Sequence, residues 1–317
     1  MRVRFWGVRG SLPAPLLPCQ VREKISAILR QALPEDLADS QSRERFLAGL
    51  PPWLFGTVGG NTSCVGVDLD DFDERIVFDC GSGIREFGQN GGDGSAGGKK
   101  PPARYHIFMS HFHWDHLQGL PFFAPVFDRS ARIDFYSPKP EFEKDLSELM
   151  RYPYSPIRMK DLPAKIVFHT LEAPVQIGPA TVSFRNMNHP GGSFSYKVAH
   201  GGKRFVYATD VELEAGDFTR GEENRAFFGD ADLVAMDSQY TLMEAIEKYR
   251  WGHSSYSMVV EFAVNWGVRH MVLFHHDPAS DDRRLHEMLR SARRYLRLIF
   301  GGDMKVSLAN EGTEIIL

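Results

Sequence analysis

The stretch HFHWDH, residues 111–116, decides more about this protein than any other part of its sequence. It follows residues 105–110 (YHIFMS), an apolar run that predicts a β-strand. Three imidazoles and one carboxylate within six residues are poorly suited to a hydrophobic core. In an extended segment His111 and His113 project to the same side, and Asp115 and His116 can turn toward a second position. We therefore predict two neighbouring metal ions, and a ligand set without thiolate favours zinc, manganese or iron over calcium.

The sequence around this stretch predicts many short strands and a few amphipathic helices. Strands of four to seven residues, bounded by turn residues, are expected at 3–8, 63–69, 75–78, 132–137, 165–169, 181–185, 194–198, 204–208, 232–236 and 270–274. Helical spacing marks residues 242–249, residues 255–265 with Ser254 as the N-cap, and residues 281–298. Sheets in the middle with helices outside are the simplest packing for such a set.

Two segments do not fit this pattern of strands. Residues 20–50 have helical spacing with a break at Pro34, and they predict a helical insertion, which we place at residues 12–58 of a single domain spanning 1–317. Residues 88–102 are rich in Gly, Ser, Lys and Pro. This composition buries little apolar surface and predicts a mobile surface loop.

Composition argues against several classes of protein. The chain has 317 residues, 43% of them hydrophobic, and a formal net charge of -4, so the general attraction of a basic protein for a phosphate backbone is missing and we do not expect a long nucleic acid as partner. Three cysteines without CxxC spacing predict buried, reduced thiols. The sequence has no apolar leader and no apolar run long enough to cross a membrane, so we expect a cytoplasmic protein without a membrane partner.

With its complete HxHxDH signature at 111–116, the sequence resembles the metallo-β-lactamase superfamily. Three later runs resemble further motifs of that family: NHPGG at 188–192, YATD at 207–210 and FHHDP at 274–278. The resemblance implies an αββα sandwich (an α/β, α+β fold) with two divalent metal ions, of which Zn²⁺ is favoured and Mn²⁺ is the alternative. It also implies the ligands, by motif position. One metal would be held by His111, His113 and His189, the other by Asp115, His116 and His275, and Asp210 would bridge the two.

The phosphodiesterase side of the superfamily, which includes ribonuclease Z and cyclic-nucleotide phosphodiesterases, is the branch that the sequence resembles. Asp210 stands where the zinc β-lactamases carry Cys. The runs DSQYT at 237–241 and GHSS at 252–255 resemble the paired acidic and histidine motifs of ribonuclease Z. The runs GVRGS at 7–11 and GGNTSC at 59–64 resemble N-terminal motifs of the same branch.

The chemistry of phosphodiester cleavage suggests roles for several of these residues. Asp115 is expected to orient or deprotonate the attacking water, and His253, held by Asp237, to give a proton to the leaving alkoxide. His276 follows His275 directly, so the two side chains point to opposite sides of an extended chain and only one can bind the same metal. We choose His275 as the ligand. His276 is then left to support the site from behind or to face the substrate, and we assign it to contact with the substrate. We assign to the same role Asn61 and Arg9, which stands in a tight turn between Gly7 and Gly10 from which it can reach a phosphate oxygen.

These observations favour a hydrolase that cleaves a small phosphodiester, most of all a cyclic nucleotide, through a metal-bound hydroxide. Hydrolysis of a lactone, a thioester or a β-lactam is the first alternative, because a metal-bound hydroxide also attacks carbonyl groups. An RNA-processing endonuclease is the second, although the sequence has no long basic arm to grip an RNA. A further hypothesis is a binding module that has lost turnover, which the intact ligand motifs disfavour. Another is a di-iron oxidoreductase, which the lack of a flavin domain disfavours. Members of the family often form dimers, so the resemblance also implies a homodimer, in which the helical insertion could cover a neighbouring subunit's pocket.

Overall fold

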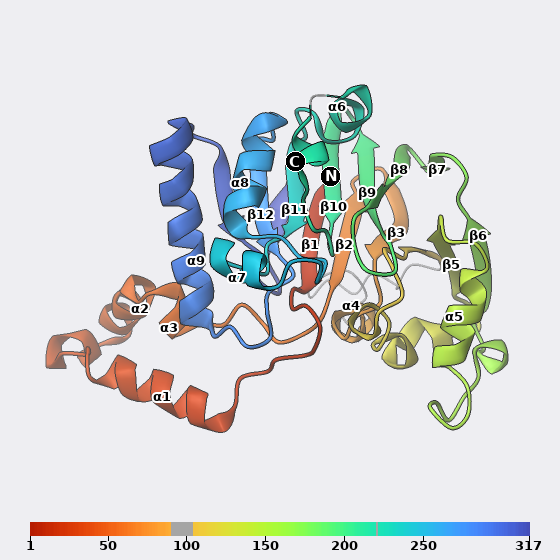
Figure 1. Cartoon of the computed structure of the whole chain (residues 1–317). Coiled ribbons are helices and arrows are strands. Elements are labelled where there is room, and N and C mark those ends of the chain that lie inside the picture. The colour runs from red at the N-terminus through yellow and green to blue at the C-terminus, as the bar shows by residue number, and fades with distance from the viewer. Residues whose placement is uncertain (90–103, 220) are drawn as a thin grey trace.

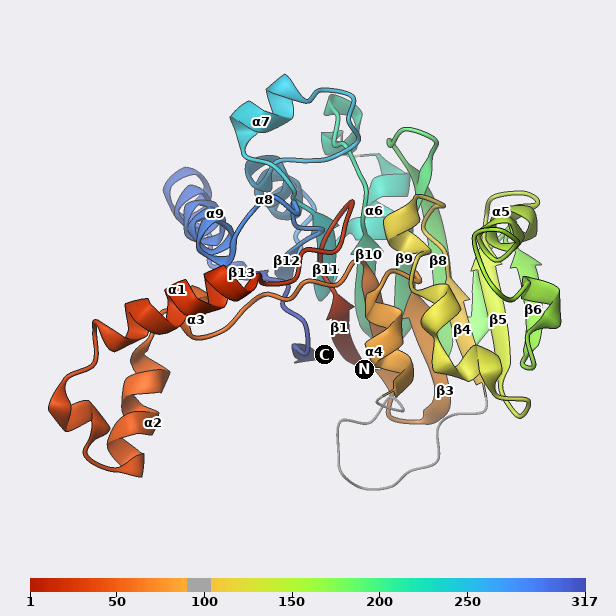
Figure 2. The same ribbon diagram turned by 90° about the horizontal axis from the view of Figure 1, so that it is seen from below.

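Two β-sheets packed face to face form the centre of the structure, and helices cover their outer faces (Figure 1). The structure is a computed structural model that describes residues 1–89, 104–219 and 221–317. The view in Figure 2, from below, shows the same order of layers, with α4 on one side of the sheets and α8 and α9 on the other. The predicted αββα sandwich is confirmed.

Within the described residues each sheet has seven strands. The first runs in the order β14-β1-β2-β3-β4-β5-β6, and the second in the order β13-β12-β11-β10-β9-β8-β7. In the first sheet the strands are β1 (Arg2–Gly7), β2 (Cys64–Leu69), β3 (Phe72–Phe78), β4 (Arg104–Phe108), β5 (Arg132–Ser137), β6 (Lys165–Thr170) and β14 (Glu314–Ile316). In the second they are β7 (Val175–Ile177), β8 (Ala180–Met187), β9 (Ser193–His200), β10 (Lys203–Ala208), β11 (Leu233–Asp237), β12 (His270–Phe274) and β13 (Lys305–Leu308).

Both sheets combine an antiparallel part with a parallel part. Strands β3 to β6 pair in parallel in the first sheet, and β10 to β13 pair in parallel in the second. The loops that leave the carboxyl ends of these parallel strands can therefore meet at one edge of the sandwich, where open α/β sheets usually bind their ligands. Every strand expected from the sequence is present, with ends shifted by up to three residues.

An aromatic cluster joins the two sheets below that edge. Phe78 on β3 is fully buried, and its ring lies 5.2 Å from Tyr207 and 6.1 Å from Phe205 on β10 and 5.7 Å from Phe108 on β4. Large aromatic rings contribute more burial per residue than any other side chain. This part of the core therefore gives the strand ends above it a rigid support.

The helices cover the outer faces of both sheets. α4 packs on β1 and β2, α8 packs on β12, and α9 packs on β13. Their bounds and those of the other helices outside the insertion are α4 (Gly83–Gln89), α5 (Phe142–Leu149), α6 (Glu222–Phe228), α7 (Leu242–Glu247), α8 (Tyr256–Asn265) and α9 (Asp282–Tyr295), the last continued by a π-helical turn at Leu296–Phe300. Short 3₁₀ turns lie at Trp114–His116, Leu120–Phe122, Ala124–Phe127, Met159–Asp161 and Ala215–Phe218.

One predicted helix cap is wrong. Ser255, not Ser254, caps α8, because its side chain accepts a hydrogen bond from the backbone N–H of Met258. The hydroxyl of Ser254 instead donates to the carbonyl of Val211 at 2.6 Å and accepts from the N–H of Leu213 at 3.0 Å. Ser254 thus ties the start of α8 to the loop that follows β10.

The chain between β1 and β2 forms a helical arm that extends away from the sandwich (Figures 1 and 2). Its elements are α1 (Pro18–Leu29), a 3₁₀ turn (Pro34–Leu37), α2 (Ser40–Gly49) and α3 (Pro52–Phe55). Lys24 on α1 pairs with the buried carboxylate of Asp282 at the start of α9 and so anchors the arm. Val21 and Ile25 are partly exposed at 41% and 53%. The homodimer stays a prediction. The assignment of residues 1–317 to a single domain also stays a prediction.

Some expectations fell short or lie outside the described residues. The two short C-terminal strands, β13 and β14, had not been expected. Of the predicted loop at 88–102, residues 88 and 89 belong to α4, and the remainder lies outside the described residues. Cys64 and Cys80 are buried and free, but Cys19 is exposed, contrary to the expectation of three buried thiols. No helix in the described residues is long and apolar enough to cross a membrane.

Candidate metal centre

The side chains of the candidate site come from loops at the ends of five strands. Asp79 follows β3, the run 111–116 follows β4, His189 follows β8, Asp210 follows β10 and His275 follows β12. Asp79, Asp210 and His275 have positive φ angles of 61°, 52° and 59°. A left-handed backbone conformation at a residue other than glycine costs about 1–3 kcal/mol of conformational free energy. It persists only where the surrounding structure holds it, and such residues are common at functional sites. Here it turns the chain sharply at the ends of β3, β10 and β12.

One group of four side chains gathers His111, His113, His189 and Asp210. Each of the four offers one ligand atom, and these atoms all lie within 4.8 Å of one another. The Oδ1 atom of Asp210 is 3.6 Å from Nε2 of His111 and 3.7 Å from Nε2 of His189. Three imidazoles and one carboxylate oxygen are a donor set that zinc accepts.

A second group gathers Asp115, His116 and His275 beside the first. Their ligand atoms also lie within 4.8 Å of one another. The Oδ2 atom of Asp210 lies 3.0 Å from Nε2 of His116 and 3.1 Å from Nε2 of His275. The two oxygens of Asp210 therefore face different ligand groups, which is the position expected of a bridging carboxylate.

The donor atoms of the two groups fit divalent metal ions. Nε2 of His111 and Nε2 of His116 are buried, and neither has a hydrogen-bond partner among the described residues. Buried polar atoms are normally satisfied, so two unpaired ring nitrogens that face a carboxylate point to an electron-pair acceptor between them. The Asp115 and Asp210 carboxylates are both buried and repel each other electrostatically, so a bound cation would compensate their charge.

Asp79 supports the second group from behind. Its Oδ2 atom accepts a hydrogen bond from Nδ1 of His116 at 2.7 Å. The carboxylate also accepts from the backbone N–H and the hydroxyl of Ser110 and from the hydroxyl of Tyr207. A carboxylate behind a ligand histidine fixes the ring and its tautomer, and leaves Nε2 of His116 free to face the site.

Replacing Asp79 by Asn is expected to weaken metal binding by about 10–100-fold, because His116 loses its charged acceptor. The measurement is the dissociation constant of zinc, obtained by competition with a chromophoric chelator. Asp134→Asn is the matched control. Asp134 is also fully buried on the first sheet, but it binds Arg104, Arg132 and His169 away from the site. An unchanged zinc affinity in Asp79→Asn would contradict the supporting role.

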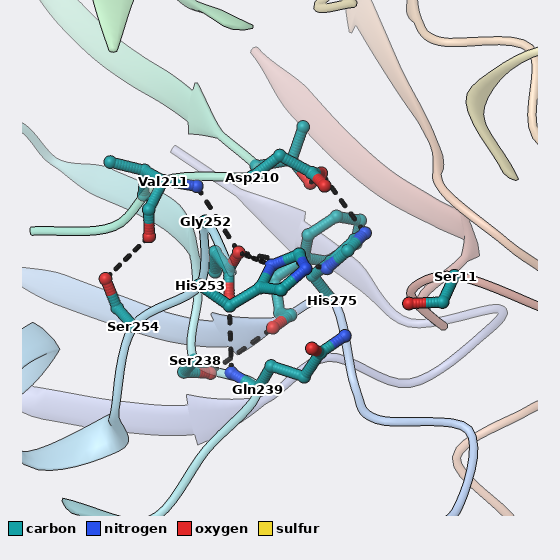
Figure 3. Close-up of polar contacts among 12 residues, drawn as sticks. Ser11, Asp210, Val211, Ser238, Gln239, Gly252, His253, Ser254 and His275 are labelled. Carbon is teal, nitrogen blue, oxygen red and sulfur yellow. Dashed lines mark hydrogen bonds and ion pairs between the residues drawn. The ribbon is translucent and has the colours of Figure 1, made fainter. Parts of the chain in front are cut away.

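His253 and Asp237 form a pair next to both groups. Nδ1 of His253 lies 2.6 Å from Oδ2 of Asp237, which is fully buried at the end of β11. Burial disfavours the charged imidazole, but the Asp237 carboxylate outweighs it and raises the pKa of His253 to about 9. Figure 3 shows the ring of His253 beside that of His275, with the ring centroids 5.1 Å apart. The pair therefore places an imidazole, whose positive charge the buried Asp237 carboxylate would balance, close to the ligand histidines.

Comparison with known proteins places this arrangement in a family. The model of the beta-lactamase superfamily domain matches residues 74–276, from β3 through both ligand groups to the residue after His275. The chain belongs to the beta-lactamase superfamily. With its His/Asp cluster it is a metal-dependent hydrolase of that superfamily.

Individual relatives are distant. The chain is 24% identical over 268 residues to Ribonuclease Z of Acaryochloris marina (strain MBIC 11017), over 69% of this chain and 81% of the relative. Among solved structures, it is similar to Zn²⁺-bound PqqB of Methylobacterium extorquens, with a TM-score of 0.64 and 14% identity over 100% of each chain. It is also similar to a diphosphatase of the PhnP family, with a TM-score of 0.63 and 15% identity over 100% of this chain and 97% of that one. The likeness to the two structures shows the fold.

Three residues expected to contact substrate are instead part of the framework in this superfamily member. Arg9 is 3% exposed, and its guanidinium donates to the carbonyls of Gly59 and Ser280 at 2.9 and 2.7 Å. The side-chain amide of Asn61 donates to Glu311 at 3.0 Å. We correct the substrate role of both, because their polar atoms already hold the loops around β1 and β2 together.

His276 is the third corrected residue. It is buried, and its Nε2 lies 2.9 Å from the carbonyl of Ala309, on the side away from the ligand groups. The adjacent His275 faces Asp115 and Asp210. The two side chains point to different sides as expected, but His275 has a left-handed φ of 59°, so the chain is not extended there and strand alternation is not the cause. His276 belongs to the framework and does not face the substrate.

Two residues that support the site were not expected from the sequence. The backbone N–H of Ser11 donates to Oδ2 of Asp115 at 2.8 Å. Glu212 accepts from the backbone N–H groups of Arg250 and Gly252 at 2.8 Å each, and the carbonyl of Gly252 lies 2.8 Å from Nδ1 of His189. The only signal for Glu212 is its position two residues after Asp210, which alone predicts nothing.

Proposed function

We propose that this chain hydrolyses a phosphodiester with two divalent metal ions, Zn²⁺ in preference to Mn²⁺, and that a small cyclic nucleotide is its substrate. One observation carries the proposal. Asp210 turns its two oxygens toward two different ligand groups, and the hydrogen-bonded pair of His253 and Asp237 stands beside them. The similar proteins support the type of substrate, because a ribonuclease and a diphosphatase both cleave bonds to phosphorus.

In this proposal His111, His113 and His189 hold one ion, Asp115, His116 and His275 hold the other, and Asp210 is shared. Two such ions lower the pKa of a water, orient the phosphate oxygens and offset the negative charge that develops during attack. Zinc fits the imidazole-rich donor set, and the similar PqqB structure is itself Zn²⁺-bound.

The protein's own side chains position the attacking water and protonate the leaving group. Oδ2 of Asp115 accepts from the N–H of Ser11 and lies 3.3 Å from Nε2 of His275, so its direction is fixed from two sides. It orients the attacking water and accepts its proton. Nδ1 of His253 is held by Asp237, so the proton available to the leaving oxygen is the one on Nε2.

Hydrolysis of a carbonyl substrate and cleavage of RNA are the two competing hypotheses for the activity. A thioester releases a thiolate, which departs without a proton donor, so the Asp237–His253 pair disfavours a thioester. A lactone and a β-lactam also release a group that must be protonated, so the pair alone does not separate them from a phosphodiester. The similarity to Ribonuclease Z keeps an RNA-processing endonuclease as the second candidate. The net charge of -4 speaks against a long polyanion.

A substrate panel separates these functions. Protein stripped with a chelator and reloaded with zinc or manganese is given bis(4-nitrophenyl) phosphate, 2′,3′- and 3′,5′-cyclic nucleotides, nitrocefin, a lactone, a thioester and a precursor transfer RNA. The expected result is metal-dependent cleavage of the aryl diester and of a cyclic nucleotide. Turnover of nitrocefin, the thioester or the lactone alone would refute the phosphodiesterase, and cleavage of the RNA with no cyclic-nucleotide activity would favour the endonuclease.

A further inference from the structure

Two separate cavities reach the row of histidines at the metal centre. One, of about 530 Å³, has His113 in its wall, and the other, of about 700 Å³, has His253 in its wall. They share no lining residue. The ring of His189 lies between the two, 5.0 Å from His113 and 5.4 Å from His253. A substrate bound at the metals can therefore extend in two directions, and the two directions differ in chemistry.

The cavity at His253, which we call the α7 cavity, is mostly apolar. Its other lining residues come from α7 and the turn after it, from the start of α8 and from the segment after β10, and they include Leu213, Leu242, Ala245, Ile246, Tyr249 and Met258. Ile246 and Tyr249 are 62% and 60% exposed, so apolar surface is open to a ligand there. Burial of such surface favours the binding of an apolar group.

Charge in the α7 cavity disfavours an anion. Glu212 and Glu214 line it, and none of its described lining residues is Lys or Arg. The guanidinium of Arg250 lies 5.6 Å from the ring of Tyr249, but Arg250 is not part of the wall. The cavity at His113 differs, because Lys139 and Arg151 line it together with the aromatic Trp114 and Tyr154.

We propose that the α7 cavity is the leaving-group subsite and takes an uncharged, largely apolar alcohol, such as a nucleoside that carries no further phosphate. The inference rests on the proposed function, because it places the part of the substrate that carries the leaving oxygen. In a cyclic nucleotide this part is the nucleoside, which stays joined to the phosphate through its second ester bond. The oxygen of the attacking water bonds to phosphorus and its proton passes to Asp115. The bond from phosphorus to the leaving oxygen breaks, and this oxygen takes the proton from Nε2 of His253. The group attached to that oxygen then extends past His253 into the α7 cavity, with a base or aryl ring against Tyr249.

The test inserts one positive charge into the wall of the cavity. Ile246→Lys is compared with Met243→Lys, which changes the charge equally on the same helix at a residue that is 64% exposed but not part of the wall. The substrates are methyl 4-nitrophenyl phosphate and its 3-carboxylate analogue, both with zinc-loaded enzyme. The measured quantity is kcat/KM for the carboxylated substrate divided by kcat/KM for the neutral one.

The ratio is expected to rise about fivefold in Ile246→Lys, in line with a partly exposed ion pair, and to change less than twofold in Met243→Lys. An equal ratio in the two variants would overturn the subsite. If neither the wild type nor the variants cleave either diester, the proposed function fails. The cavity is then tested alone by measuring adenosine binding in an NMR titration. Adenosine should bind the wild type and Met243→Lys equally and Ile246→Lys several-fold more weakly. No binding, or equal binding by all three, would refute the subsite.

Discussion

Replacement of Asp210 by Ala is expected to remove both metal ions and to lower kcat/KM for bis(4-nitrophenyl) phosphate by at least about a thousandfold. The two oxygens of this carboxylate face the two ligand groups separately, at 3.6 Å from His111 and 3.0 Å from His116. Loss of the side chain therefore takes one donor from each group and removes the carboxylate that the two groups share. The measurements are metal content per chain by mass spectrometry and steady-state kinetics on the same preparation.

The control must separate lost metal from lost fold. Asp210 is buried and has a positive φ, so circular dichroism and the unfolding temperature of Asp210→Ala are compared with those of Asp134→Asn, a second buried carboxylate away from the site. A folded Asp210→Ala protein that keeps two metals and its turnover would refute the bridge.

His253→Ala is expected to lower kcat by about 10²–10⁴-fold and, unlike Asp210→Ala, to leave the metal content unchanged. The imidazole is held by Asp237 and its second nitrogen serves the leaving oxygen, so removal costs proton transfer and not metal affinity. The loss should depend on the leaving group. The kcat for a 4-nitrophenyl phosphodiester, whose leaving group departs readily without a proton, should fall least. The kcat for a cyclic nucleotide, whose leaving oxygen is an alkoxide, should fall most.

Asp237→Asn is the companion variant for this prediction. It keeps the shape of the partner but removes the charge that raises the pKa of His253 to about 9, and should show the same dependence on leaving group to a smaller degree. Loss of metal in His253→Ala would make His253 a ligand, a possibility that its position beside Asp210 and His275 allows. An equal loss for all leaving groups would make its role structural.

The sequence predicted the parts of the site that lie close together along the chain. HFHWDH combines four polar side chains in six residues directly after an apolar strand, so local spacing was enough to suggest a metal site. Asp210, His189 and His275 are far from it in sequence, and only resemblance to a family located them. The structure shows why they meet: each follows a strand at the same edge of the sandwich.

The errors came from residues whose partners are distant in sequence. Arg9 stands in a Gly-rich turn that suggested contact with a phosphate, but its acceptors are carbonyls up to 271 residues away. His276 could not be oriented until Ala309 was placed beside it by β13, a short strand with no clear pattern. Glu212 acts through backbone groups 38 and 40 residues later. Such contacts depend on tertiary packing, which local periodicity does not contain.

The most direct test of a two-metal phosphodiesterase is a stoichiometric titration. Metal-free protein is given zinc in steps from zero to four ions per chain, and hydrolysis of bis(4-nitrophenyl) phosphate is measured at each step. Activity should rise until two zinc ions are bound per chain and then stay constant. A plateau at one ion per chain, or two bound ions without hydrolysis, would contradict the proposed function.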